Sequence, residues 1–181
     1  MNAECGGGGN SLLAASIFKM YGSSKKVYLF DTFAGMTEPT KEDARLFKNQ
    51  PVMKIFEESQ KESYNDWCYA SMEDVQNNFE QAGLLTPSVK FVKGDVAETL
   101  AISENIPDKI CVLRLDTDFY ESTKKELEIL YPRLTIGGVL IIDDYGTWAG
   151  SKQATDEYFA SIGKRPFLQY TDRTGRAAVK F

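Results

Sequence analysis

Residues 110–145 constrain the fold of this chain more than any other stretch. They contain two short apolar runs, 110–115 and 139–142, and aspartates follow each run. Residues 121–134, between the runs, have the period of a helix, and a Gly-Gly pair then predicts a turn before the second run. The apolar positions on one face of this helix are Leu127, Leu130, Tyr131 and Leu134. Two apolar strands joined by a helix form a βαβ unit, whose strands are normally parallel and buried on both faces.

Four aspartates, Asp116, Asp118, Asp143 and Asp144, follow these two predicted strands. Because parallel strands end at the same edge of a sheet, we expect the carboxylates to converge on one rim, where open α/β sheets bind ligands. Such a cluster must be stabilised by a cation, by protonation, or by Arg and Lys. The chain has no His, and no Cys lies near these turns, so oxygen ligands would favour Mg²⁺ over zinc. The alternative is that the aspartates only cap helices and form turns.

Composition limits the class of protein. A chain of 181 residues is expected to form a single domain over residues 1–181. The net charge of −5 argues against binding of nucleic acid, which requires clustered positive charge. No apolar run is long enough to cross a membrane. Three cysteines argue against a disulfide framework and fit a cytoplasmic protein. Without His, proton transfer would fall to a carboxylate, Lys, Tyr or Cys.

The N-terminal stretch combines glycines with a helix and an acid. Glycines at positions 6–9 precede a predicted helix over 12–21, an arrangement that lets backbone N–H groups approach a ligand. A flexible glycine linker or tail is the alternative. A strand over 27–30 then ends at Asp31, roughly 20 residues past the glycines, where a nucleotide-binding fold places the acid that holds ribose hydroxyls.

A long polar connection follows. Residues 38–72 have weak periodicity, with two short helices predicted at 43–47 and 52–61, and a connection of this length is usually a functional lid or a mobile insertion. Its aromatic residues could line a pocket, although packing onto the domain is the commoner use. A helix is predicted from Ser71 to Gln81, with Gly83 ending it, then a strand over 89–93 closed by Gly94 and Asp95. A short helix is expected over 96–103.

The C-terminal part predicts an antiparallel ending. A helix over 151–162 precedes strands at 165–171 and 177–181, which flank a turn signal at Asp172–Gly175. The fold class is therefore α/β: a Rossmann-like, mostly parallel sheet that finishes in an antiparallel hairpin. This architecture is associated with class I methyltransferases that use S-adenosylmethionine.

Specific motifs then resemble one family. Residues 113–146 read LRLDTDFYESTKKELEILYPRLTIGGVLIIDDYG. This stretch is similar to the signature of the TylF-type sugar O-methyltransferases, the macrocin and mycinamicin enzymes, with L-D-x-D-x-Y-x-S-T, L-Y-P-x-L-x-x-G-G and D-D-Y. Residues 28–35 (YLFDTFAG) and 91–100 (FVKGDVAETL) also match that family's layout. The first family motif, E-C-G-x-x-x-G-G-S, is shorter here and reads E-C-G-G-G-G-N-S.

The resemblance implies a methyl donor, S-adenosylmethionine, lying across the carboxyl ends of the strands. In that reading, its amino acid part is held near the N-terminal motif, its ribose by Asp31 and its adenine by Asp95. The full set of expected donor-binding residues is Glu4, Cys5, Gly6, Ser11, Asp31, Thr32, Gly94, Asp95 and Asp116.

The resemblance also implies a metal-assisted reaction. Mg²⁺ would be held by Asp116, Asp143 and Asp144 and would lower the pKa of an acceptor hydroxyl. We expect Asp116 to act as the catalytic base, and Tyr145 and Trp148 to border the acceptor. The expected partner is a small-molecule hydroxyl acceptor, a sugar or a macrolide-like or phenolic compound.

Members of the family carry a segment before the first motif that helps to cover the substrate and to build a dimer. Compared with them, we expect this chain to be a short form or an N-terminally truncated one, with a homodimer as one possible assembly. The alternative function is a non-catalytic, nucleotide-binding α/β module whose acidic rim binds a divalent ion structurally.

Overall fold

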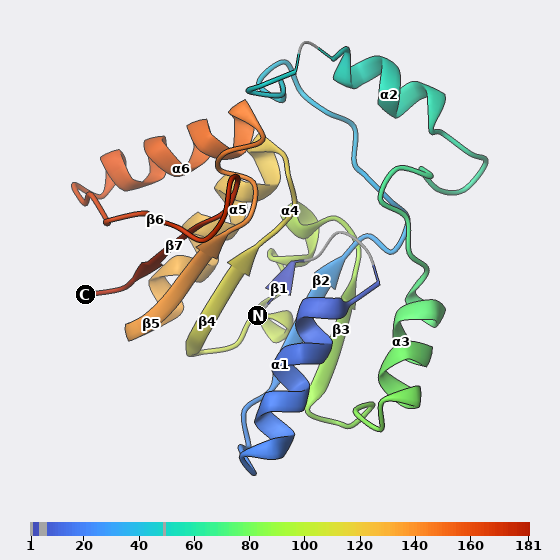
Figure 1. The fold of residues 1–181 in the computed structure, drawn as a ribbon, viewed down its shortest axis with the longest axis vertical. Helices are drawn as coiled ribbons and strands as arrows, with labels where there is room; N and C mark the ends of the chain where they lie inside the picture. Colours follow the sequence, from blue (N-terminus) through green and yellow to red (C-terminus); the bar gives the residue numbers. More distant parts are fainter. Residues whose placement is uncertain (1, 4–6, 49) are drawn as a thin grey trace.

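The computed structural model describes residues 2–3, 7–48 and 50–181. In this part of the chain the strands form one sheet in the order β3-β2-β1-β4-β5-β7-β6 (Figure 1). The strands are β1 (Asn2–Ala3), β2 (Val27–Asp31), β3 (Val89–Lys93), β4 (Ile110–Leu115), β5 (Leu134–Ile142), β6 (Gln169–Tyr170) and β7 (Arg176–Val179). Strands β1 to β5 pair in parallel, whereas β7 pairs antiparallel with both β5 and β6. The predicted parallel sheet with a C-terminal antiparallel pair is confirmed.

Helices cover both faces of this sheet. They are α1 (Gly9–Met20), α2 (Val52–Glu58), α3 (Met72–Gln81), α4 (Val96–Thr99), α5 (Tyr120–Leu130) and α6 (Ala149–Ser161), with 3₁₀ turns at Ser103–Asn105 and Tyr131–Arg133. The side chain of Ser71 accepts a hydrogen bond from Asp74 N, which gives α3 the predicted N-terminal cap. The helix predicted over 96–103 stops at Thr99 and continues only as a turn.

The hydrophobic core is divided between the two faces. On one face α1 and α3 pack against β2, with Leu29, Val75 and Phe79 buried. On the other face Phe30, Leu113 and Leu127 belong to a core that α5 and α6 share with β4 and β5. Because neighbouring residues of a strand point to opposite faces, Leu29 and Phe30 reach different cores. Strand β2 therefore contributes to the core on both sides of the sheet.

One part of the sheet is less covered. A wide groove of about 780 Å³ runs between α1 and the beginning of β4. Its lining is largely apolar and includes Leu13, Ile17, Val112 and Ile141. Leu13 is 60% exposed and Val112 is 38% exposed. This face of β4 thus keeps apolar side chains in contact with solvent, whereas its opposite face is fully packed.

The structure corrects the boundary between α5 and β5. The helix predicted over 121–134 ends at Leu130, and β5 begins at Leu134 instead of Val139. Pro132 has no N–H to donate to the carbonyl four residues earlier, so the α-helical hydrogen bonds end here and the chain continues as the 3₁₀ turn Tyr131–Arg133. The Gly137–Gly138 pair, predicted to form a turn, instead forms an irregularity inside β5: Ile110 pairs with Leu134, but Val112 pairs with Val139. Gly137 has φ +78°, a conformation that favours glycine.

The connection between β2 and α3 is mostly irregular. Its helix α2 lies beyond the carboxyl ends of the strands (Figure 1). The helix predicted at 43–47 is wrong, because Arg45 forms an isolated antiparallel bridge with Trp148 there. The aromatic side chains serve packing, as Trp67 contacts Phe119 and Trp148. None of the helices in the described residues is long and apolar enough to cross a membrane.

Candidate active site

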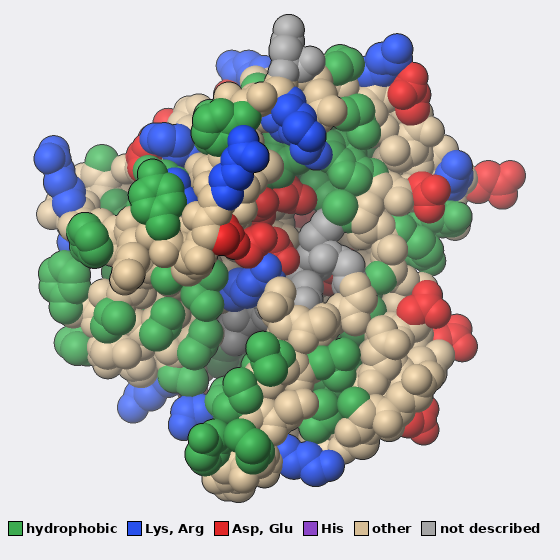
Figure 2. Space-filling view, viewed as in Figure 1, with side chains coloured by type: hydrophobic (Ala, Val, Ile, Leu, Met, Phe, Trp, Pro, Cys, Tyr) green, Lys and Arg blue, Asp and Glu red, His purple; other side chains and the backbone are tan. Residues whose placement is uncertain are grey.

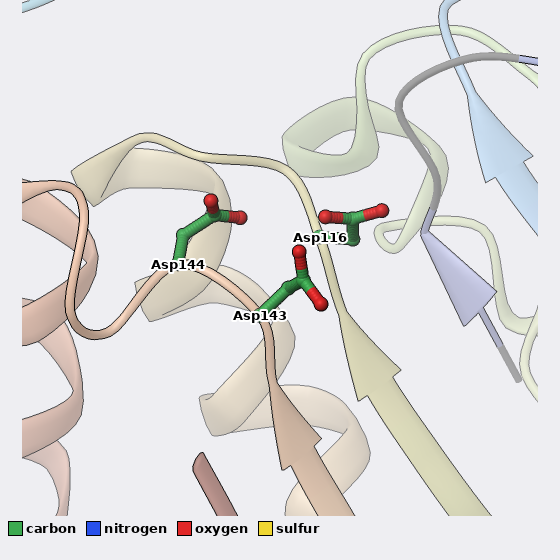
Figure 3. A group of neighbouring side chains, drawn as sticks. All are labelled: Asp116, Asp143 and Asp144. Atoms are coloured by element: carbon green, nitrogen blue, oxygen red, sulfur yellow. The ribbon is translucent and has the colours of Figure 1, made fainter. Parts of the chain in front are cut away.

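The acidic rim forms at the ends of β4 and β5. Leu115 pairs with Ile142, so Asp116 and Asp143 leave the sheet side by side. One carboxylate oxygen from each of Asp116, Asp143 and Asp144 lies within 4.8 Å of the others (Figure 3). Figure 2 shows acidic side chains gathered in a hollow near the middle of this face, with basic side chains along its upper rim. The structure thus brings together the three aspartates predicted to hold a metal.

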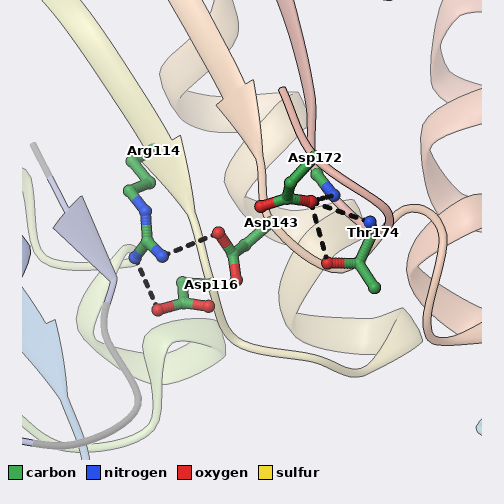
Figure 4. A network of polar contacts seen from close by, with 6 residues as sticks. Arg114, Asp116, Asp143, Asp172 and Thr174 are labelled. Atoms are coloured by element: carbon green, nitrogen blue, oxygen red, sulfur yellow. Dashed lines mark hydrogen bonds and ion pairs between the residues drawn. The ribbon is translucent and has the colours of Figure 1, made fainter. Parts of the chain in front are cut away.

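Arg114 is part of this cluster, although no sequence motif pointed to a role for it. Its Nη1 donates to Asp116 Oδ2 at 2.5 Å, and its Nη2 donates to Asp143 Oδ1 at 2.8 Å (Figure 4). A signal for this arrangement was present in the sequence, because residues i and i+2 of a strand share a face. Arg114 therefore had to lie on the side of β4 that carries Asp116.

The cluster remains short of positive charge. Burial raises the pKa of Asp116 to about 8 even though Arg114 opposes this change. Burial and the neighbouring carboxylate of Asp118 also raise the pKa of Asp144 well above its ordinary value. One guanidinium does not balance three carboxylates, so the cluster must take up protons or a cation.

The ligand set fits a hard divalent cation. All donors are carboxylate oxygens, which suit Mg²⁺ and similar ions. Oδ2 of Asp144 is buried and has no hydrogen-bond partner among the residues that the structure describes. A buried oxygen without a partner is costly, and coordination to a cation would satisfy it.

Asp118 and the nearby aromatic residues have other partners. Asp118 adopts a left-handed backbone with φ +65°, and its Oδ1 accepts a hydrogen bond from Trp148 Nε1 at 2.7 Å. Trp148 is buried against Phe119, and Tyr145 donates to Asp156 on α6 at 2.7 Å. Both side chains therefore also serve packing, and the expectation that Tyr145 and Trp148 border an acceptor stays a prediction.

A second cavity adjoins the acidic rim at the ends of β2, β3 and β4. Its lining includes five of the predicted donor-binding residues: Asp31, Thr32, Gly94, Asp95 and Asp116. Gly94 N donates to the carbonyl of Asp31 at 3.0 Å, which holds the ends of β2 and β3 together. Asp116 thus belongs both to the acidic cluster and to this cavity.

Two of these acids also stabilise local structure. Asp31 Oδ1 accepts a hydrogen bond from Phe33 N at 2.6 Å, and Asp95 Oδ1 accepts from Ala97 N at 2.8 Å as the cap of α4. Turn and cap roles of this kind were the alternative explanation for the rim acids. For Asp31 and Asp95 such roles are present, and they orient the carboxylates toward the cavity.

The cavity is narrow in this structure, with a volume of about 60 Å³. Ligand sites for molecules of drug size usually measure ~300 Å³ or more, so a nucleoside needs the walls to move apart. Met36 and Cys68, from the connection between β2 and α3, form part of those walls. Glu4, Cys5 and Gly6 lie outside the described residues, and Ser11 is buried in α1, where it lines the wide groove instead.

Comparison with known proteins identifies the family. A family model described as macrocin-O-methyltransferase (TylF) matches residues 3–177. The chain belongs to the TylF family. The match covers nearly the whole chain and confirms the resemblance that residues 113–146 indicated.

Curated relatives in the TylF family are longer proteins. The chain is 32% identical over 169 residues to an 8-demethyl-8-(2,3-dimethoxy-alpha-L-rhamnosyl)-tetracenomycin-C 4'-O-methyltransferase of Streptomyces olivaceus, a match that covers 93% of this chain and 60% of the relative. It is also 32% identical over 171 residues to the mycinamicin III 3''-O-methyltransferase of Micromonospora griseorubida, covering 93% of this chain and 63% of the relative. The chain therefore spans about six-tenths of the length of these relatives.

Solved structures confirm the class I methyltransferase fold. The O-methyltransferase NovP matches with a TM-score of 0.80 and 30% identity, over 96% of this chain and 67% of NovP. The calicheamicin methyltransferase CalS11 matches with a TM-score of 0.66 and 20% identity, over 93% of this chain and 66% of CalS11, a likeness of fold alone. The sheet order and the antiparallel ending of this TylF-family chain are thus those of a methyltransferase.

Proposed function

We propose that this TylF-family chain is an S-adenosylmethionine-dependent O-methyltransferase that acts, with Mg²⁺, on a hydroxyl of a sugar or natural-product acceptor. One observation carries the proposal: Asp116 belongs to both the donor cavity and the carboxylate cluster. A methyl donor and an activated hydroxyl would therefore meet at one residue. The activities for which the relatives are named, O-methylation of tetracenomycin and mycinamicin compounds, support this chemistry.

The donor would lie across the ends of β2, β3 and β4. Asp31 would hold the ribose hydroxyls and Asp95 the adenine, while Glu4, Cys5 and Gly6 would hold the amino acid part. In the reaction the acceptor oxygen forms a bond to the methyl carbon as the bond from carbon to the sulfonium sulfur breaks. S-adenosylhomocysteine, a neutral thioether, is then released. Alignment of oxygen, carbon and sulfur would supply much of the rate.

The acceptor would lie against the acidic cluster. Asp116, Asp143 and Asp144 would hold Mg²⁺, which lowers the pKa of a coordinated hydroxyl when bound. Asp116 would take the hydroxyl proton, because it is the carboxylate that belongs to both the donor cavity and the acidic cluster. Arg114 orients this carboxylate through Oδ2.

The test is Asp143→Asn, assayed for methyl transfer to a panel of sugars, phenols and macrolide-like compounds with Mg²⁺ or with EDTA. Loss of one ligand should lower Mg²⁺-dependent activity by about 100-fold. Binding of S-adenosylhomocysteine should be unchanged. Asp108→Asn, which changes an exposed acid at the opposite edge of the sheet, is the matched control. Full activity of Asp143→Asn in EDTA would refute the metal role.

One observation favours a second candidate, a non-catalytic module that binds a nucleotide and keeps its acids for structure. Arg114 already pairs with two of the aspartates, as a purely structural cluster would require. A thermal-shift series with S-adenosylmethionine, S-adenosylhomocysteine, NAD and Mg²⁺ separates the two candidates. Stabilisation by the sulfur ligands favours the methyltransferase, and stabilisation by NAD alone favours the module.

A further inference from the structure

Arg114 contacts two of the three carboxylates in the acidic cluster. Its backbone belongs to β4, where Asn2 and Ile141 are its partners on the flanking strands. The side chain is only 13% exposed, so the surrounding protein limits its movement. A guanidinium stays charged under all conditions in which the protein is folded. The acidic cluster therefore contains a positive charge of its own, held in a fixed position.

The two hydrogen bonds of Arg114 take one oxygen from each of two aspartates. Nη1 donates to Oδ2 of Asp116 at 2.5 Å, and Nη2 donates to Oδ1 of Asp143 at 2.8 Å (Figure 4). The planar guanidinium presents its donors as a rigid fork, so it engages both carboxylates at the same time. A carboxylate oxygen that accepts a short, charged hydrogen bond is a poor ligand for a second cation. Each of these aspartates can therefore offer a metal ion at most one oxygen.

Asp144 completes the set of candidate ligands. Its Oδ2 is buried and has no hydrogen-bond partner among the residues that the structure describes. One oxygen from each of the three aspartates lies within 4.8 Å of the others, so a single cation can reach all three (Figure 3). Solvent or substrate would have to supply the remaining ligands of that cation. The site is thus poor in protein oxygens for a cluster of three carboxylates.

The number of available oxygens distinguishes Mg²⁺ from Ca²⁺. Ca²⁺ takes about six to eight oxygen ligands and often binds both oxygens of one carboxylate. Mg²⁺ is smaller, requires octahedral geometry and keeps several waters, so a few protein oxygens suffice for it. A site that can offer only one oxygen from Asp116 and one from Asp143 therefore suits Mg²⁺ better than Ca²⁺.

We propose that Arg114 determines which divalent ion the acidic cluster accepts, by withholding one oxygen of Asp116 and one of Asp143 and so favouring Mg²⁺ over Ca²⁺. The inference rests on the metal role in the proposed function and assigns a specificity-determining residue to the same site. Arg114 acts on the ion through the two carboxylates, so it is a positioning residue. Its charge also repels every cation, but this repulsion is nearly equal for two ions of the same charge.

A purely structural role for Arg114 leads to a different expectation. An arginine that only neutralises the aspartates would weaken the binding of Mg²⁺ and of Ca²⁺ by the same factor. Its removal would then strengthen the binding of both ions equally. The ratio of the two dissociation constants would stay the same. This ratio therefore separates a selective role of Arg114 from a structural one.

The experiment measures the dissociation constants of Mg²⁺ and Ca²⁺ by calorimetry, with the full chain first treated with a chelator and dialysed. The test variants are Arg114→Gln, which removes the guanidinium, and Arg114→Lys, which keeps the charge but lacks the planar fork. Because Arg114→Lys still neutralises the aspartates, the test does not depend on the folding of Arg114→Gln. The control is Arg165→Gln, at an exposed position beyond the end of α6.

We expect the wild type and the control to bind Mg²⁺ at least as tightly as Ca²⁺. Relative to Mg²⁺, the affinity for Ca²⁺ should rise at least about 10-fold in Arg114→Gln and by a smaller factor in Arg114→Lys. Tighter binding of Ca²⁺ than of Mg²⁺ by the wild type would overturn the proposal. An unchanged ratio of dissociation constants in either test variant would also overturn it.

The outcome for Arg114 can be told apart from the outcome for the methyltransferase. Mg²⁺-dependent methyl transfer by a wild type that prefers Ca²⁺ in calorimetry would overturn the inference about Arg114 alone. Absence of binding of either ion by the wild type would overturn this inference together with the metal role. S-adenosylhomocysteine affinity, measured in each variant, reports separately on the donor cavity.

Discussion

Asp31 and Asp95 each have a structural role and a predicted binding role at this site. Asp31 fixes the turn after β2 through Phe33 N, whose residue has φ +49°, and it also faces the donor cavity. Asp95 caps α4 and lines the same cavity. A substitution at either position therefore mixes a structural effect with a binding effect, and the choice of replacement decides which one is measured.

For Asp31 the two effects can be separated. Asp31→Asn keeps an oxygen that can accept from Phe33 N, so stability should be nearly unchanged while S-adenosylhomocysteine affinity falls about 10-fold through loss of the charged hydrogen bond. Asp31→Ala should lose the same affinity and, in addition, about 1 kcal/mol of stability as the turn loses its acceptor. Calorimetry measures the first quantity and urea unfolding the second. Wild-type affinity in both variants would contradict a role in ribose binding.

Glu126 is a buried acid that the proposed mechanism does not use. It is fully buried on α5, Thr117 Oγ1 donates to its Oε2 at 2.9 Å, and its Oε1 has no partner among the described residues. Burial raises its pKa to about 8. The folded chain therefore holds a proton there that the unfolded chain releases near its usual pKa of about 4.3.

This difference predicts a pH dependence of stability. Because the pKa is raised in the folded state, the free energy of unfolding should fall as pH rises from about 4 to about 8, and the loss should level off above that range. Glu126→Gln cannot ionise, so its curve should lack this decline and exceed the wild type by a few kcal/mol at high pH. Glu128→Gln, exposed on the same helix, is the control. Parallel pH curves for wild type and Glu126→Gln would show that Glu126 is ionised in the folded state.

At the scale of elements, the connection between β2 and α3 is tied to the domain by a few polar residues. Asp43 accepts a hydrogen bond from Tyr120 N at 2.7 Å and so caps α5, whose own N-cap residue Phe119 offers no side-chain acceptor. Asn65 donates to the carbonyl of Phe56 at 2.8 Å and holds α2 in place. The predicted insertion over 38–72 is thus held by hydrogen bonds near its beginning, at Asp43, and near its end, at Asn65. Its role as a lid stays a prediction.

Gly35 lies shortly after β2, where a later part of this connection passes very close to its backbone. It has φ +83°, and a Cβ there would lie 1.8 Å from the backbone oxygen of Asn65. Gly35→Ala should therefore cost about 3 kcal/mol or more, through backbone strain and a clash that must displace the connection. Gly22 also has positive φ but nothing within 4 Å, so Gly22→Ala should cost only about 1 kcal/mol. Urea unfolding of the two variants measures both costs, and equal costs would contradict the close approach.

Local patterns predicted the elements better than their ends. Apolar runs and helical periods located strands β2 to β7 and helices α1, α3, α5 and α6, because burial imposes those patterns. The end of α5 was misplaced because Leu134 continues the apolar period while Pro132 ends the helix. The convergence of Asp116 with Asp143 could be predicted, because parallel strands end at the same edge of a sheet. The proximity of Arg45, Lys48 and Arg173 could not be predicted, because it depends on contacts between loops that are distant in the sequence.

At the scale of the whole molecule, two cores lie on opposite faces of the sheet and share β2. The core under α1 and α3 takes residues from β2 and β3, and the core under α5 and α6 takes residues from β4 and β5 together with Phe30 of β2. The donor cavity takes residues from both sides, with Asp31 and Asp95 on one and Asp116 on the other. A ligand in this cavity would link the two halves.

S-adenosylhomocysteine should therefore stabilise both halves together. At 100 times its Kd it should add about 2.7 kcal/mol to the free energy of unfolding. Amide hydrogen exchange should slow in β2 and in β4 to a similar extent, which mass spectrometry can measure for each strand. Helix α6, which does not line the cavity, serves as an internal reference. Protection confined to β2 and β3 would contradict a site that spans the centre.

The place of β1 in the sheet has a consequence for biosynthesis. Asn2 lies between Leu29 of β2 and Arg114 of β4. During translation Asn2 leaves the ribosome long before Arg114 has been made, so this part of the sheet cannot close until β4 has emerged. The nascent chain must keep β1 unpaired on one side during that interval, a period in which chaperones commonly shield exposed backbone.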